Sequence, residues 1–157
     1  MPECPGLGST GACNTPNPVR VLFLCTANSC RSQMAEGFAR HHGHGVIEAY
    51  SAGTQPTALH PLTVEVMQER GVDVSGQRAK RLSDVPEQVD LVVTVCDQAA
   101  ESCPFIPGAK RLLHWSLPDP ARATGTPEEV KTAFRRVRDE IEARVRSLVE
   151  ETKAGAS

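Results

Sequence analysis

The amino-acid sequence predicts one α/β domain of three layers, with a doubly wound, four-stranded parallel sheet flanked by helices. Short apolar runs typical of buried strands alternate with segments of helical periodicity, an order that favours parallel strands joined by crossover helices. The chain has 157 residues, which is enough for one compact core and gives little reason to expect a second domain. No internal repeat is evident. We assign the domain to residues 19–150, after a flexible extension at 1–18 and before a tail at 151–157.

The first strand is expected at Val19–Cys25, an apolar run, and the first helix from Ser32 to about His42. The next elements are a strand at Ile47–Ser51, a helix at Pro61–Arg70 that Gly71 ends, and strands at Asp90–Val95 and Lys110–His114.

A long final helix begins after Thr126, where an N-cap threonine, a proline at the first helical position and a capping-box glutamate follow one another. Apolar residues then recur at intervals of three and four, which predicts one stripe facing the sheet: Val130, Phe134, Val137, Ile141, Val145 and Leu148.

A cysteine and an arginine are separated by five small or polar residues in the loop after the first strand. The run is Cys25-Thr26-Ala27-Asn28-Ser29-Cys30-Arg31-Ser32. Backbone N–H groups of such a loop can surround a tetrahedral oxyanion, and the following helix directs its positive dipole end there. The sequence therefore predicts a nucleophile and an oxyanion-binding site, with residues 26–31 as the binding loop.

Each polar side chain of this loop has an expected role. The helix end and the cation of Arg31 are expected to lower the pKa of the Cys25 thiol, and Ser32 to hydrogen-bond the thiolate. The Arg31 guanidinium matches the oxygens of phosphate or an analogue. Asn28 tolerates left-handed backbone and can brace the loop, whereas Cys30 is expected to be structural. The alternative is a buried core cysteine beside an ordinary surface arginine.

Two more cysteines and an acid follow later strands. Cys96 ends the apolar run that begins at Leu91, and Cys103 lies seven positions further on. Parallel strands would bring Cys96 to the sheet edge that carries Cys25, so three thiols could lie within exchange distance. Asp119 lies in a proline-stiffened turn suited to a general acid. The alternatives are two unrelated buried thiols and a simple Asp-Pro turn.

Composition argues against several classes of partner. A formal net charge of −2 and 4% aromatic residues argue against nucleic acid, and no stretch is apolar enough to cross a membrane. Six cysteines without an export signal favour a reducing, cytoplasmic compartment. Cys4 and Cys13, in the extension, are interpreted as incidental exposed thiols.

With these residues in place, the chain resembles the thioredoxin-coupled arsenate reductases, which have the low-molecular-weight protein tyrosine phosphatase fold. The similarity runs from about Val19 to the final helix. It includes residues 25–37, 50–53, 90–96, 103–104, 114–115, 119–120 and 136–140. The loop alone would not separate a reductase from a phosphatase, whereas Cys96 with Cys103 does.

The resemblance implies a relay of three cysteines in arsenic detoxification. Cys25 attacks arsenate while Asp119 protonates the departing oxygen. Cys96 then attacks Cys25 and releases arsenite, and Cys103 moves the disulfide to the Cys96–Cys103 pair, which thioredoxin reduces. The resemblance implies arsenate and thioredoxin as partners, a monomer, and no bound cofactor.

Two positions depart from the family pattern. Some members bind potassium near the loop with an aspartate, where this chain has Lys80, although Asn28, Glu36 and Ser51 match the rest of that site. An ammonium there would repel the ion, so we expect potassium-independent activity and no bound metal. Ala121 replaces the usual aromatic residue of the phosphatases, which disfavours aryl phosphates.

Three rival functions remain open from sequence. The first is a low-molecular-weight phosphatase that uses Cys25, Arg31 and Asp119 alone. The second is an arsenate reductase coupled to mycothiol or glutathione, which has no evident need for Cys96 and Cys103. The third is a non-catalytic protein that binds an oxyanion or arsenite.

Overall fold

A parallel sheet of four strands, in the order β2-β1-β3-β4, forms the centre of the computed structural model, which describes residues 18–85, 88–95 and 109–156. The strands are β1 (Val19–Cys25), β2 (Ile47–Gly53), β3 (Leu91–Thr94) and β4 (Arg111–His114). The predicted fold class is confirmed.

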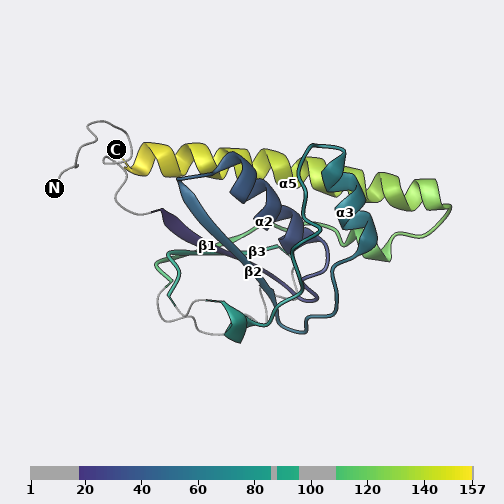
Figure 1. Ribbon diagram of the computed structural model, residues 1–157, viewed down its shortest axis with the longest axis horizontal. Coiled ribbons are helices and arrows are strands. Elements are labelled where there is room, and N and C mark those ends of the chain that lie inside the picture. Colours follow the sequence, from purple (N-terminus) through teal and green to yellow (C-terminus); the bar gives the residue numbers. More distant parts are fainter. Residues whose placement is uncertain (1–17, 86–87, 96–108, 157) are drawn as a thin grey trace.

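The α-helices are α2 (Arg31–His42), α3 (Pro61–Gln68) and α5 (Pro127–Ala156). Helix α2 packs against β1 and β2, and α3 and α5 pack against α2 and each other. Figure 1 shows α2 and α3 beside α5, which runs along the long axis of the molecule. Two short 3₁₀ helices are η1 (Leu82–Asp84) and η2 (Pro120–Arg122).

The predicted elements are all present, with small shifts at their ends. The second strand continues to Gly53, and α3 ends at Gln68, three residues before Gly71 takes a positive φ of 76°. Helix α5 continues to Ala156, into the residues that we assigned to a tail. Its capping box is formed, since Glu129 N–H donates to Thr126 Oγ1 over 3.1 Å and Thr126 N–H donates to Glu129 Oε1 over 2.8 Å.

The hydrophobic core lies between β1 and the apolar faces of α2 and α5. The central part of β1, residues 21–24, is buried, and Phe23, Phe38 and Phe134 are the largest fully buried side chains. The predicted stripe of α5 is buried from Phe134 to Leu148, while Val130 is partly buried. Within the described residues, no helix has both the length and the apolar character to span a bilayer.

The strand register fixes what lies at the carboxyl edge of the sheet. Cys25 pairs with Gly53 at the ends of β1 and β2, and Val95 N–H donates to Leu24 O over 2.9 Å just beyond β3. The loop after Cys25 therefore starts at an edge where neighbouring strands also end, which is where parallel α/β sheets place their ligand sites.

Candidate active site

The carbonyl oxygens of the loop from Cys25 to Cys30 all accept hydrogen bonds from groups that do not line the cavity in front of the loop. Their donors are the backbone N–H groups of Thr54, Gln55, Thr57, His60 and Met34, the side-chain amide of Gln33 and the hydroxyl of Thr63. In a trans peptide the N–H lies opposite the C=O. The loop therefore turns its N–H groups toward the cavity, as an oxyanion-binding loop must.

One cavity joins this loop to the segment around Asp119. It is lined by Leu117, Pro118, Asp119 and Arg122 and, from the loop, by Cys25, Thr26, Ala27, Ser29, Cys30 and Arg31. Nearly all the predicted substrate-binding residues thus line one cavity with the predicted nucleophile and acid. Asn28 is the exception, because it is buried behind the loop.

Cys25 is held at the base of this cavity by two hydrogen-bonding groups. Its Sγ lies 2.8 Å from Ser32 Oγ and 3.1 Å from the backbone N of Asn28, and its side chain is 2% exposed. Burial raises the pKa of the Cys25 thiol, while both neighbours and the Arg31 charge lower it. The predicted hydrogen bond with Ser32 and the predicted influence of the Arg31 charge are present, but the predicted net lowering of the pKa is wrong because burial outweighs them.

We predict that Ser32→Ala raises the pKa of Cys25 further, because the variant removes a hydroxyl that stabilises the thiolate. A charge-assisted hydrogen bond of about 1.5–3 kcal/mol corresponds to an increase of about one to two pKa units. The pH dependence of Cys25 alkylation by iodoacetamide, followed by peptide mass spectrometry, measures this shift. An unchanged profile would show that Ser32 does not act on the sulfur.

Asn28 adopts a left-handed conformation, with φ of +52°, which its short polar side chain was expected to tolerate, and it fastens the loop to its surroundings. Its amide nitrogen donates to Ser32 Oγ over 2.8 Å, and its Oδ1 accepts from Lys80 N over 2.8 Å and from Gln33 Nε2 over 3.0 Å. The side chain is fully buried. Two segments of the chain, the first turn of α2 and the backbone at Lys80, therefore determine where Asn28 places its N–H against the sulfur.

Arg31 and Asp119 face each other across the cavity. Arg31 Nη2 lies 3.6 Å from Asp119 Oδ2, and Arg31 Nη1 donates to Leu117 O over 3.0 Å. Asp119 Oδ1 accepts from Ala121 N over 3.0 Å, which holds the carboxyl at the start of η2. Arg31 and Asp119 thus line the same cavity as the Cys25 thiol. Their catalytic roles stay predictions.

Of the other cysteines, only Cys30 lies within the described residues. Cys30 is 2% exposed and burial raises its pKa, which agrees with an unreactive thiol. Cys96 and Cys103 lie outside the described residues, so their meeting with Cys25 stays a prediction. Cys4 and Cys13 also lie outside them.

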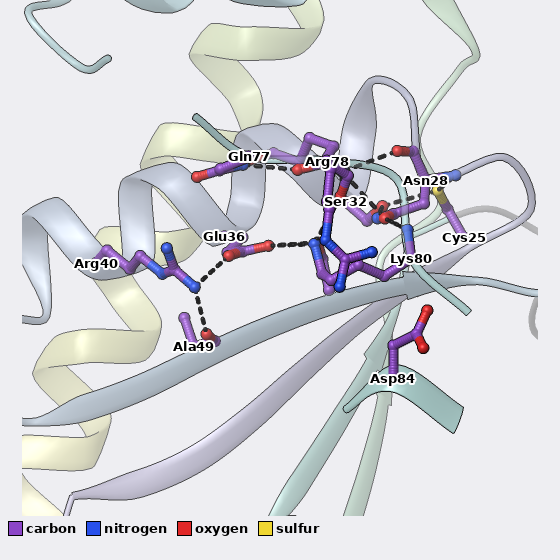
Figure 2. Close-up of polar contacts among 12 residues, drawn as sticks. Cys25, Asn28, Ser32, Glu36, Arg40, Ala49, Gln77, Arg78, Lys80 and Asp84 are labelled. Atoms are coloured by element: carbon purple, nitrogen blue, oxygen red, sulfur yellow. Dashed lines mark hydrogen bonds and ion pairs between the residues drawn. The ribbon is translucent and has the colours of Figure 1, made fainter. Parts of the chain in front are cut away.

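Behind the loop, a buried carboxylate is neutralised by side-chain cations (Figure 2). Glu36 is 1% exposed, and its carboxylate accepts from the Ser51 hydroxyl. Arg40 Nη2 lies 2.5 Å from Glu36 Oε2, and Lys80 Nζ lies 3.4 Å from Glu36 Oε1. The Lys80 ammonium also donates to Arg78 O over 2.8 Å. Tethered cations therefore already lie at this carboxylate.

Sequence reasoning missed the segment that orients the loop. Residues 54–60 supply four backbone donors to the loop carbonyls, although their sequence contains no motif that predicts this. Arg122, at the edge of the cavity, was also missed. Its position three residues after the candidate acid, in a short turn, was the available signal.

Comparison with known proteins identifies a family whose pattern this chain matches and relatives of similar sequence. Residues 20–156 match the family described as low molecular weight phosphotyrosine protein phosphatase. An arsenate reductase of Shouchella clausii is 47% identical over 131 residues, which cover 83% of this chain and 94% of that protein.

Two solved structures are similar as well. An arsenate reductase in the phosphate binding state has a TM-score of 0.75 at 32% identity, covering 85% of this chain and 98% of that one. A thioredoxin-dependent arsenate reductase of Corynebacterium glutamicum has a TM-score of 0.70 at 32% identity, covering 89% of this chain and 65% of that one.

Proposed function

The chain belongs to the low molecular weight phosphotyrosine protein phosphatase family and, within it, to the arsenate reductases, and we propose that it reduces arsenate through Cys25, Cys96 and Cys103 and is regenerated by thioredoxin. One observation supports this chemistry most: the carbonyl oxygens of the loop around the Cys25 thiol accept hydrogen bonds from groups outside the cavity. It supports a site in which backbone N–H groups and Arg31 hold a tetrahedral oxyanion against the sulfur.

In the first step, the Cys25 thiolate forms a bond to the arsenic atom of arsenate. One arsenic–oxygen bond breaks, and Asp119 donates a proton so that the oxygen leaves as water. The arsenic remains in the +5 state and is now bound to sulfur. The contact of Arg31 with Asp119 supports this assignment, because it holds the acid at the cavity that Cys25 also lines.

In the second step, the Cys96 thiolate attacks the Cys25 sulfur, and the sulfur–arsenic bond breaks. Its electron pair stays on arsenic, which leaves as arsenite in the +3 state, and a Cys25–Cys96 disulfide forms. Cys103 then attacks Cys96 and releases Cys25 as a thiolate. The dithiol of thioredoxin supplies the two electrons that reduce the Cys96–Cys103 disulfide.

The reductase is tested by following NADPH consumption with arsenate, thioredoxin and thioredoxin reductase. We expect the intact protein to turn over many times. Cys103→Ser should release about one equivalent of arsenite but consume almost no NADPH, since its Cys25–Cys96 disulfide cannot be passed on to thioredoxin. Normal cycling by Cys103→Ser would exclude the relay. A phosphatase would instead hydrolyse aryl phosphates regardless of Cys103, and a protein that only binds the oxyanion would consume no NADPH.

We predict activity that does not depend on potassium, because Lys80 places its ammonium against Glu36. The rate in KCl should equal the rate in NaCl at the same ionic strength, and Lys80→Asp, which exchanges the cation for a carboxylate, provides the comparison. A several-fold stimulation of the unmodified protein by potassium over sodium would refute the prediction.

A further inference from the structure

A second arginine lies at the rim of the cavity that contains Cys25. Arg122, the last residue of η2, lines this cavity, and its Nε lies 3.8 Å from Asp119 Oδ2. Its side chain is 84% exposed, whereas that of Arg31 is 11% exposed. The two guanidinium groups therefore approach the same carboxylate oxygen, one from within the cavity and one from its solvent side.

The two arginines differ in how firmly they are held. Arg31 donates to Leu117 O over 3.0 Å and lies 3.6 Å from Asp119, so both ends of its fork have protein partners. Arg122 has a longer contact with Asp119 on an exposed side chain, a kind of pair that contributes little to stability. Its position at the rim is therefore not explained by a structural role.

The charges at the cavity show what Arg122 adds. Among the described residues that line it, Arg31, Asp119 and Arg122 are the charged ones. Arg122 therefore adds one positive charge to the field that an approaching anion meets, whether or not Asp119 carries its proton.

We infer that Arg122 attracts tetrahedral oxyanions into the loop and makes the cavity favour anions over neutral molecules. This inference rests on the proposed function and adds a residue that selects substrates by charge. Such a charge acts through its field, which raises the local concentration of anions and is screened by salt. Arg122 should therefore affect the capture of the oxyanion more than the chemical step.

The test compares an anionic and a neutral reagent at the same sulfur. Cys25 of the reduced full-length protein is alkylated at low ionic strength with iodoacetate and, separately, with iodoacetamide, and the modified peptide is quantified by mass spectrometry. Dividing the two rates removes the thiolate fraction, because both reagents need the same thiolate. Loss of one charge near the sulfur should lower the iodoacetate-to-iodoacetamide ratio about threefold in Arg122→Gln.

Two variants are matched controls. Arg122→Lys keeps the charge and should keep most of the ratio, while Arg146→Gln removes the charge of an exposed residue of α5 that does not line the cavity. The difference between Arg122→Gln and the intact protein should disappear at about 0.5 M salt, where the screening length is only a few ångströms. In the arsenate assay, Arg122→Gln should raise KM with little change in kcat.

An Arg122→Gln ratio equal to that of Arg146→Gln would overturn the inference. So would an Arg122→Lys ratio as low as that of Arg122→Gln, because the effect would then depend on side-chain shape. The alkylation ratio needs neither arsenate turnover nor thioredoxin. A protein that fails to reduce arsenate but shows the expected ratios would refute the proposed function and leave the role of Arg122 intact.

Discussion

Cys25→Ser is expected to abolish arsenate reduction, lowering the rate to that of the assay without protein. A serine hydroxyl is a much weaker nucleophile near neutral pH, and its oxygen cannot accept the attack by Cys96 that transfers the electron pair to arsenic. The loss should therefore be complete rather than partial. NADPH consumption coupled to thioredoxin measures it.

Cys30→Ser is the matched control, because it makes the same atomic change in the same loop at a side chain that is also 2% exposed. The Sγ of Cys30 lies 3.5 Å from Ser29 Oγ, which a serine can accommodate. We expect activity within about tenfold of the intact protein, since substitutions that keep the size and contacts of a side chain are tolerated best. Equal loss in the two variants would mean that the loop as a whole, and not one nucleophile, had been disrupted.

Gly53→Ala is expected to cost on the order of 100-fold in kcat/KM, although the variant lies outside the loop, because displacing reacting groups by about 1 Å can have this effect. A Cβ at Gly53 would lie 2.6 Å from Thr26 O and 3.0 Å from both Asn28 N and Asn28 Cβ. Two of these atoms belong to the backbone of the loop, so the side chains cannot simply rotate away. The loop must shift, and the Asn28 N–H moves away from the Cys25 sulfur.

Gly76→Ala makes the same chemical change where an added Cβ meets nothing within 4 Å. Steady-state kinetics of both variants, with thermal unfolding to show that each is folded, separate a local effect on the loop from a general effect of replacing glycine. If folded Gly53→Ala retains normal kcat/KM, the loop does not need the tight packing against β2 that the structure shows.

The parts of the fold that sequence predicted are those with strong local signals. The apolar run of β1 and the capping box at Thr126 depend on neighbouring residues, and both elements begin where expected. The tolerance of Asn28 for left-handed backbone was also recognised locally, from its short polar side chain, and the residue adopts that conformation. Local chemistry was sufficient at each of these positions.

Other features depend on residues that are distant in sequence. The donors of residues 54–60 reach the loop because β1 and β2 end side by side, and no property of the segment itself indicates this. The pKa of Cys25 was predicted with the wrong sign because burial, which dominates it, depends on the whole fold. The contact of Lys80 with Glu36 was anticipated only through a family comparison.

The most direct test of the proposed relay is to map the disulfides by mass spectrometry after the reduced protein has reacted with one equivalent of arsenate. We expect a Cys96–Cys103 disulfide in the intact protein and a Cys25–Cys96 disulfide in Cys103→Ser, each with one equivalent of arsenite. Arsenite formed without a disulfide between these cysteines, or with one that excludes Cys96, would contradict the relay.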